Sequence, residues 1–126
     1  MELEPLGYVS TDAEKVPRFY SHSDIKGSLV LDEQYSAGVA DFRPGQKISV
    51  IFYFHKSPPF TPDNMRIVPS HSVELRGVFS TRSPVRPNPI GLSVVKISEV
   101  RGSVIEVTGL DMLDGTPILD IKPYKD

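Results

Sequence analysis

The sequence contains no cysteine, and this absence excludes several kinds of chemistry. A chain without thiols can form no disulfide framework and no thiolate metal site, and it offers no cysteine nucleophile. The composition is compatible with a reducing compartment. The longest strongly apolar run, Ile48–Phe54, is far shorter than the roughly 20 residues that cross a membrane as a helix. Met1–Pro5 has no basic region followed by an apolar stretch, so we expect no signal peptide and a cytoplasmic location.

The sequence also lacks the common catalytic motifs. It has no glycine-rich dinucleotide fingerprint, no P-loop and no Gly-x-Ser-x-Gly elbow. The three histidines, His22, His55 and His71, do not have the spacing of a metal site. We therefore predict no bound metal.

Prolines and glycines divide the chain into short pieces. Twelve prolines and nine glycines in 126 residues disfavour a helical bundle, and this length fits one domain, residues 1–126. The pieces rich in Val, Ile, Phe and Tyr are predicted strands. They are Leu6–Ser10, Gly27–Leu31, Lys47–His55, Ser72–Ser80, Gly91–Val100, Ser103–Leu110 and Pro117–Lys122. We predict an all-β fold, a single-sheeted closed or nearly closed β-barrel with long connecting loops and little helix. A β-sandwich fits the same pattern.

Only Asp32–Val39 is expected to be helical, with Asp32 as its N-cap. Two hairpin turns are predicted at Arg101-Gly102 and Asp114-Gly115, because glycine tolerates a positive φ.

Charge is unevenly distributed along the chain. The net charge is −2, yet residues 76–101 hold five basic residues against one acidic residue, Glu99. Within this stretch, Pro84, Pro87 and Pro89 each fix φ and remove an amide donor. We predict a stiff, extended arm that carries Arg82 and Arg86 toward an anion. A rigid loop with solvated arginines is the alternative.

Two further segments have the composition of a site. Asp114 could accept hydrogen bonds from a ribose or an amino group, and Gly115 allows a ligand to approach the backbone closely. A simple tight turn explains the same residues. His55 and Lys56 follow the most apolar predicted strand, where site residues often collect.

Together these segments resemble the TrmO/TsaA-like family of SAM-dependent tRNA methyltransferases. The residues that carry the resemblance are Gly7–Ser10, Pro17-Arg18, Phe54-His55-Lys56, Gly77–Gly91 and Asp114–Tyr124. Two departures stand out. Position 19 is Phe where the family pattern has Gln. The sequence also ends at Asp126, just after the final block, and so resembles a short form without the C-terminal extension of longer members.

The resemblance implies methyl transfer from S-adenosyl-L-methionine (SAM) to the exocyclic nitrogen of N6-threonylcarbamoyladenosine beside the anticodon of tRNA. It also implies a homodimer with the cofactor near the subunit interface. By carry-over, the residues expected to bind the cofactor are Pro17, Arg18, His55, Lys56, Arg82, Leu92, Asp114, Gly115, Thr116 and Pro117.

The acceptor side is less specified. Arg86 and Asn88 are the expected RNA contacts, because a bidentate arginine suits a phosphate or a carboxylate. Asp114 and His55 are the only candidates for removing the acceptor proton, and the catalytic residue stays open. Two alternatives also stay open. One is a non-enzymatic module that binds SAM and RNA, and the other is a methyltransferase for a different small substrate.

Overall fold

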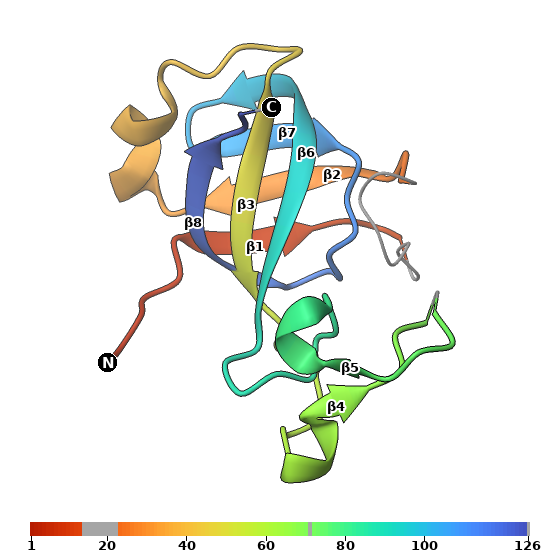
Figure 1. The fold of residues 1–126 in the computed structure, drawn as a ribbon. Coiled ribbons are helices and arrows are strands. Elements are labelled where there is room, and N and C mark those ends of the chain that lie inside the picture. Colours follow the sequence, from red (N-terminus) through yellow and green to blue (C-terminus); the bar gives the residue numbers. More distant parts are fainter. Residues whose placement is uncertain (14–22, 71, 126) are drawn as a thin grey trace.

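Six strands form one antiparallel sheet that closes into a ring in the order β1-β2-β7-β6-β3-β8 (Figure 1). The computed structural model describes residues 1–13, 23–70 and 72–125. The strands of the ring are β1 (Gly7–Ser10), β2 (Lys26–Leu31), β3 (Lys47–Tyr53), β6 (Ile90–Arg101), β7 (Val104–Thr108) and β8 (Pro117–Pro123). The predicted all-β class, with one sheet closed on itself, is confirmed for the described residues.

Alternating side chains fill the inside of the ring. In β3, Ile48, Val50 and Phe52 are buried, while the residues between them face outward. The same period of two gives β7 its buried Ile105 and Val107. Because each strand contributes apolar side chains to the same interior, one core of mainly valine, leucine and isoleucine holds the ring together.

One predicted strand is wrong. Only Arg76–Gly77 of Ser72–Ser80 is extended, as β5, and it pairs with β4 (Arg66–Ile67) in a separate two-stranded sheet. Most of the apolar side chains that suggested a strand lie at the surface, with Val73 96% and Phe79 74% exposed, and only Val78 is buried. They have no sheet to pack against, and a 3₁₀ helix, η4 (Val78–Ser80), follows immediately.

The predicted helix and both predicted turns are present. The helix is a 3₁₀ helix, η2 (Glu33–Val39), and the Asp32 carboxylate caps it by accepting a hydrogen bond from the Gln34 amide at 3.1 Å. Gly102 and Gly115 have φ values of 59° and 82°, the left-handed region expected at these turns.

A long excursion separates β3 from β6. It holds the short helix η3 (Pro62–Asn64), the β4–β5 pair and η4, and it projects beyond one end of the ring (Figure 1). This end of the ring also carries most of the predicted site. In the described part of the chain, no helix has the length and apolarity of a membrane span.

Candidate active site

The site begins where β6 continues past the end of β7. The ladder between these strands runs from Arg101↔Val104 to Lys96↔Thr108, so the first six residues of β6 have no partner on that side. The side chains of Arg82 and Asp111, which belong to two different loops, bind this unpaired part of β6. Arg82 donates from Nη1 to the carbonyl oxygen of Leu92 at 3.2 Å, and the buried Ser93 donates from Oγ to the carboxylate of Asp111 at 2.6 Å. The edge is therefore held by side chains from two loops.

The Asp114–Pro117 turn is clamped to the first strand. Gly115 donates its amide to the Val9 carbonyl at 2.7 Å, and the Thr116 carbonyl accepts from the Val9 amide at 2.9 Å. Asp114 accepts a hydrogen bond from the Thr11 amide at 3.0 Å. Thr116 is buried, and its hydroxyl donates to the Leu113 carbonyl. The turn is thus fixed in position, and its Asp114 carboxylate remains exposed at the rim.

The turn lies beside the end of β3. A Cβ built on Gly115 would stand 3.8 Å from Nε2 of His55. Two predicted segments that are 60 residues apart in sequence therefore meet in the structure. The absent side chain of Gly115 leaves space beside the imidazole that a Cβ would partly fill.

The proline segment is folded rather than extended, so the predicted straight arm is wrong. Arg86 donates from Nη1 to the Thr81 carbonyl at 2.8 Å and to the Ser83 carbonyl at 3.3 Å. Its guanidinium carbon lies 5.9 Å from the centre of the Phe79 ring. The Ser83 amide donates to the Thr81 hydroxyl at 3.3 Å and the Val85 amide to the Ser83 hydroxyl at 3.2 Å, and these local bonds bend the chain further. Proline fixes φ, but these local hydrogen bonds decide the direction of the chain.

The folded segment is attached to the end of β3. Ser57 donates from Oγ to the Pro84 carbonyl at 3.0 Å, and the Phe54 amide donates to the Pro89 carbonyl at 2.8 Å. These bonds keep His55 and Lys56 beside the proline segment. Lys56 and Asn88 both have exposed side chains. Pro17 and Arg18, the remaining predicted residues, lie outside the described residues.

Sequence reasoning missed three residues that organise this site. Thr11 fixes Asp114, and Ser93 joins β6 to Asp111 at the start of the loop that carries Asp114. The available signal was a serine among the apolar residues that open β6, because a polar group that becomes buried there needs a partner. Nothing in the sequence identified Asp111 as that partner.

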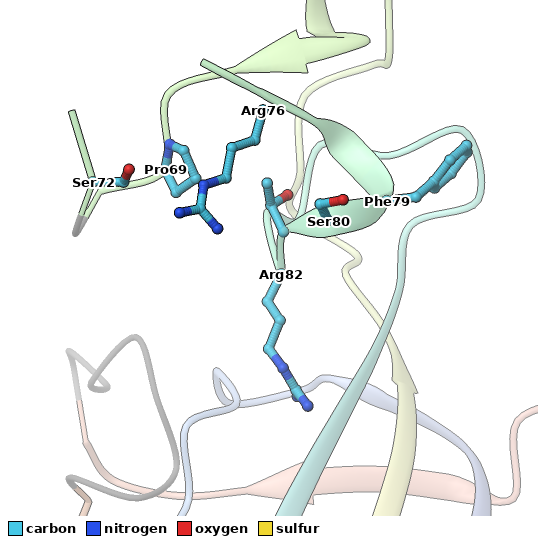
Figure 2. Close-up of a pocket in the computed structure, with 7 residues that line it drawn as sticks. Pro69, Ser72, Arg76, Phe79, Ser80 and Arg82 are labelled. Atoms are coloured by element: carbon cyan, nitrogen blue, oxygen red, sulfur yellow. The ribbon is translucent and has the colours of Figure 1, made fainter. Parts of the chain in front are cut away.

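A hollow of about 530 Å³ opens on the excursion between β3 and β6 (Figure 2). Its lining includes Arg76 and Arg82, beside Pro69, Ser72, Phe79, Ser80 and Thr81. Figure 2 shows the Arg82 side chain extending from the loop toward the strands of the ring. Arg82 therefore links this basic hollow to the unpaired edge of β6.

The clearest electrostatic perturbation lies away from the site. On β6, a hydrogen bond from Arg101 lowers the pKa of the Glu99 carboxyl and raises that of the arginine. Among the described residues, no group of three or more carboxylates and imidazoles gathers as a metal site would require. The organised polar groups at the site end are those that suit an organic ligand: carboxylates, guanidinium groups, an imidazole and an open backbone turn.

A comparison with known families decides the assignment. The family described as "tRNA-methyltransferase O N-terminal domain" matches residues 9–126. The chain belongs to this family. The predicted family is thereby confirmed.

Similar proteins agree with this assignment. An S-adenosyl-L-methionine-binding protein of Archaeoglobus fulgidus is 40% identical, and the match covers 98% of this chain and 89% of that protein. A human tRNA (adenine(37)-N6)-methyltransferase is 47% identical over 96% of this chain but only 29% of its own length. A crystal structure of TrmO has a TM-score of 0.80 at 29% identity and covers 99% of this chain, which spans 57% of that one.

Proposed function

We propose that this protein transfers a methyl group from SAM to the exocyclic nitrogen of N6-threonylcarbamoyladenosine in a tRNA anticodon loop. The observation that carries the proposal is the meeting of the Asp114-Gly115 turn with His55, next to the edge held by Arg82. In a member of this family, the nearness of the Gly115 backbone to the His55 imidazole supports one ligand site that the Asp114 carboxylate borders.

The described residues fit the proposed cofactor. Gly115 leaves space that a Cβ would occupy, Asp114 offers a carboxylate to the cofactor's hydroxyl or amino groups, and Arg82 offers a charge to its carboxylate. We also assign to this ligand the other residues expected from the sequence, which are His55, Lys56, Leu92, Thr116, Pro117, Pro17 and Arg18. When bound, SAM supplies a methyl group on a positively charged sulfur, which needs no metal or covalent nucleophile.

The protein's own task is alignment. An in-line displacement requires the acceptor nitrogen to lie about 3–3.5 Å from the methyl carbon, opposite the sulfur. As the carbon–sulfur bond breaks and the carbon–nitrogen bond forms, the nitrogen must lose its proton. His55 and Asp114 are the bases we assign to this step, directly or through one water. Asp114 already accepts from Thr11, so the more adaptable of the two is His55.

The acceptor would enter from the side of the proline segment. Within the described part of the protein, Arg86 donates hydrogen bonds only from Nη1. Its Nε and Nη2 could therefore donate to a phosphate or to the threonyl carboxylate. Asn88 is exposed on the same segment. The basic hollow that Arg76 and Arg82 line adjoins these residues, and its size suits part of a single-stranded loop.

A second copy of the chain would complete this surface. Tyr53 and Ile90 are direct partners on β3 and β6, are 42% and 37% exposed, and lie outside the ring at its site end. Leu92, at 46% exposure, continues the same apolar face next to Arg82. A homodimer that covers this face would place the cofactor near the subunit interface.

The test is transfer of labelled methyl from SAM to tRNA that carries N6-threonylcarbamoyladenosine, compared with the same tRNA carrying unmodified adenosine. We expect label only in the first. Asp114→Asn should weaken SAM binding, because a neutral amide replaces the carboxylate while the turn is retained. SAM binding by the unaltered protein without transfer to either tRNA would favour a non-enzymatic module, and transfer only to a small molecule would favour the other alternative.

A further inference from the structure

Strand register places three lysines together on the outer wall of the ring. Lys47 on β3 lies directly opposite Lys96 on β6, and Lys122 on β8 pairs with Ser49, two residues further along β3. All three side chains are exposed, and the alternation of burial in β3 shows that this face points outward. We call Lys47, Lys96 and Lys122 the lysine cluster. Figure 1 shows β8, β3 and β6 side by side with the C-terminus near the start of β3.

The cluster is only partly neutralised by the protein. Like charges directly opposite each other in an antiparallel pair are destabilising. Within the described residues, neither Lys47 nor Lys96 forms an ion pair, and only Lys122 has a carboxylate, that of Asp120 at 3.3 Å. Lys47 instead places its ammonium 5.8 Å from the centre of the Tyr124 ring. A chain with a net charge of −2 thus keeps an excess of positive charge on one wall.

The cluster is separate from the proposed active site. Lys122 and Tyr124 belong to the last block that resembles the family, yet they lie at the opposite end of β3 from His55. The six residue steps from Lys47 to Tyr53 correspond to about 20 Å along the strand. In duplex DNA, with about 3.4 Å per base pair, the same distance spans roughly six base pairs, and an A-form RNA stem, whose base pairs are more closely spaced along the axis, fits slightly more.

We propose that the lysine cluster binds phosphates of the helical stem next to the modified loop of the tRNA. This inference rests on the proposed function, because the loop must occupy the site end of the ring for the stem to run along β3 and β6. Ammonium groups on flexible stems act as point charges and suit a phosphate backbone without reading its sequence. The cluster therefore supplies affinity and orientation, whereas the site end selects the modified base.

The first measurement is the salt dependence of tRNA binding for a Lys47→Glu/Lys96→Glu variant. Each lost phosphate contact should lower the slope of log K against log salt by about one, so the double variant should lose about two. Lys47→Gln/Lys96→Gln, which removes charge without adding acids, should change the slope in the same direction. Lys26→Glu is the comparison variant, because Lys26 is exposed on β2 outside the cluster and lies two strands from Lys96, with Thr108 between them. It should lower the slope by no more than one.

The second measurement compares RNA hairpins with the same modified loop and stems of four or ten base pairs. The long hairpin should bind the Glu variant at least tenfold more weakly than the unaltered protein, while the short hairpin, which ends before the cluster, should bind both equally. SAM affinity should be unchanged in every variant. Equal tRNA affinity and salt slope in the double variant and the unaltered protein would overturn the proposal. Loss of binding to polyglutamate instead would assign the cluster to an acidic protein partner.

These outcomes separate the two proposals. If the unaltered protein transfers no methyl group to tRNA, the proposed function fails whatever the lysine variants do. If transfer occurs and short hairpins lose as much affinity as long ones, only the lysine proposal fails.

Discussion

At the scale of single residues, the turn beside His55 depends on Gly115. Its φ of 82° is a conformation that costs an L residue roughly 1–2 kcal/mol, while a Cβ there would meet the imidazole only at ordinary contact distance. Gly115→Ala should therefore lower the free energy of unfolding in urea by about that amount and weaken SAM binding. Gly38→Ala is the control, because a Cβ at Gly38 would meet nothing within 4 Å and should leave both quantities nearly unchanged.

Ser93 provides a second prediction at this scale. Its buried hydroxyl donates to Asp111 at 2.6 Å and joins β6 to the loop that carries Asp114. Ser93→Ala should lower the unfolding free energy by about 1–3 kcal/mol, because the carboxylate loses a donor in a partly buried place. Calorimetric titration with SAM should also show weaker binding, since the loop is less firmly held. Ser98→Ala, at an exposed position of the same strand, should have neither effect. Equal behaviour of the two variants would contradict this role.

The sequence predicted which residue types form the site better than it predicted their arrangement in space. His55, Asp114 and Gly115 could be selected from the sequence because they belong to motifs, and the structure brings them together. The direction of the proline segment could not be predicted, because it depends on Arg86 reaching backward to the Thr81 carbonyl. That contact is set by local hydrogen bonds which no residue pattern encodes.

At the scale of elements, the packing of β3 against β6 depends on one glycine, Gly91. A Cβ on Gly91 would lie 2.4 Å from the Phe52 ring and 2.7 Å from that of Phe54, and these rings already pack edge to face with centres 4.9 Å apart. Gly91→Ala should lower the unfolding free energy by about 1–3 kcal/mol through overpacking. In Gly91→Ala/Phe52→Leu the smaller side chain makes room, so the loss should be less than the sum of the two single changes. Additive losses of unfolding free energy in urea denaturation would show that the Phe52 side chain does not cause the destabilisation in Gly91→Ala.

Whether an element could be predicted from the sequence depends on whether other elements pack against it. The six strands of the ring could be predicted because each contributes apolar residues to the core, and β3 and β7 show a clear alternation. Ser72–Ser80 has a similar composition, but Val73 and Phe79 remain exposed, since only the short β4 pairs with this part of the chain. A sequence pattern predicts which residues can face a core, but it does not show whether the rest of the fold provides a core at that place.

At the scale of the whole molecule, the exposed apolar face at the site end makes a prediction about assembly. Tyr53→Lys/Ile90→Lys places two charges on the proposed dimer interface without entering the core. Light scattering should show a dimer for the unaltered chain and a monomer for this variant, with weaker SAM binding in the monomer. Leu3→Lys changes an exposed apolar residue in the segment before β1 and should remain dimeric. A monomeric unaltered chain that binds SAM fully would contradict the shared-interface account.

The central claim is that the site end of the ring holds SAM beside a modified tRNA base. The most direct test is mass spectrometry of nucleosides from tRNA incubated with the purified protein and SAM. The account predicts that N6-threonylcarbamoyladenosine gains one methyl group, and that Asp114→Asn and His55→Asn greatly reduce the gain. An unchanged nucleoside profile, under conditions in which SAM binding is measured in the same sample, would contradict it.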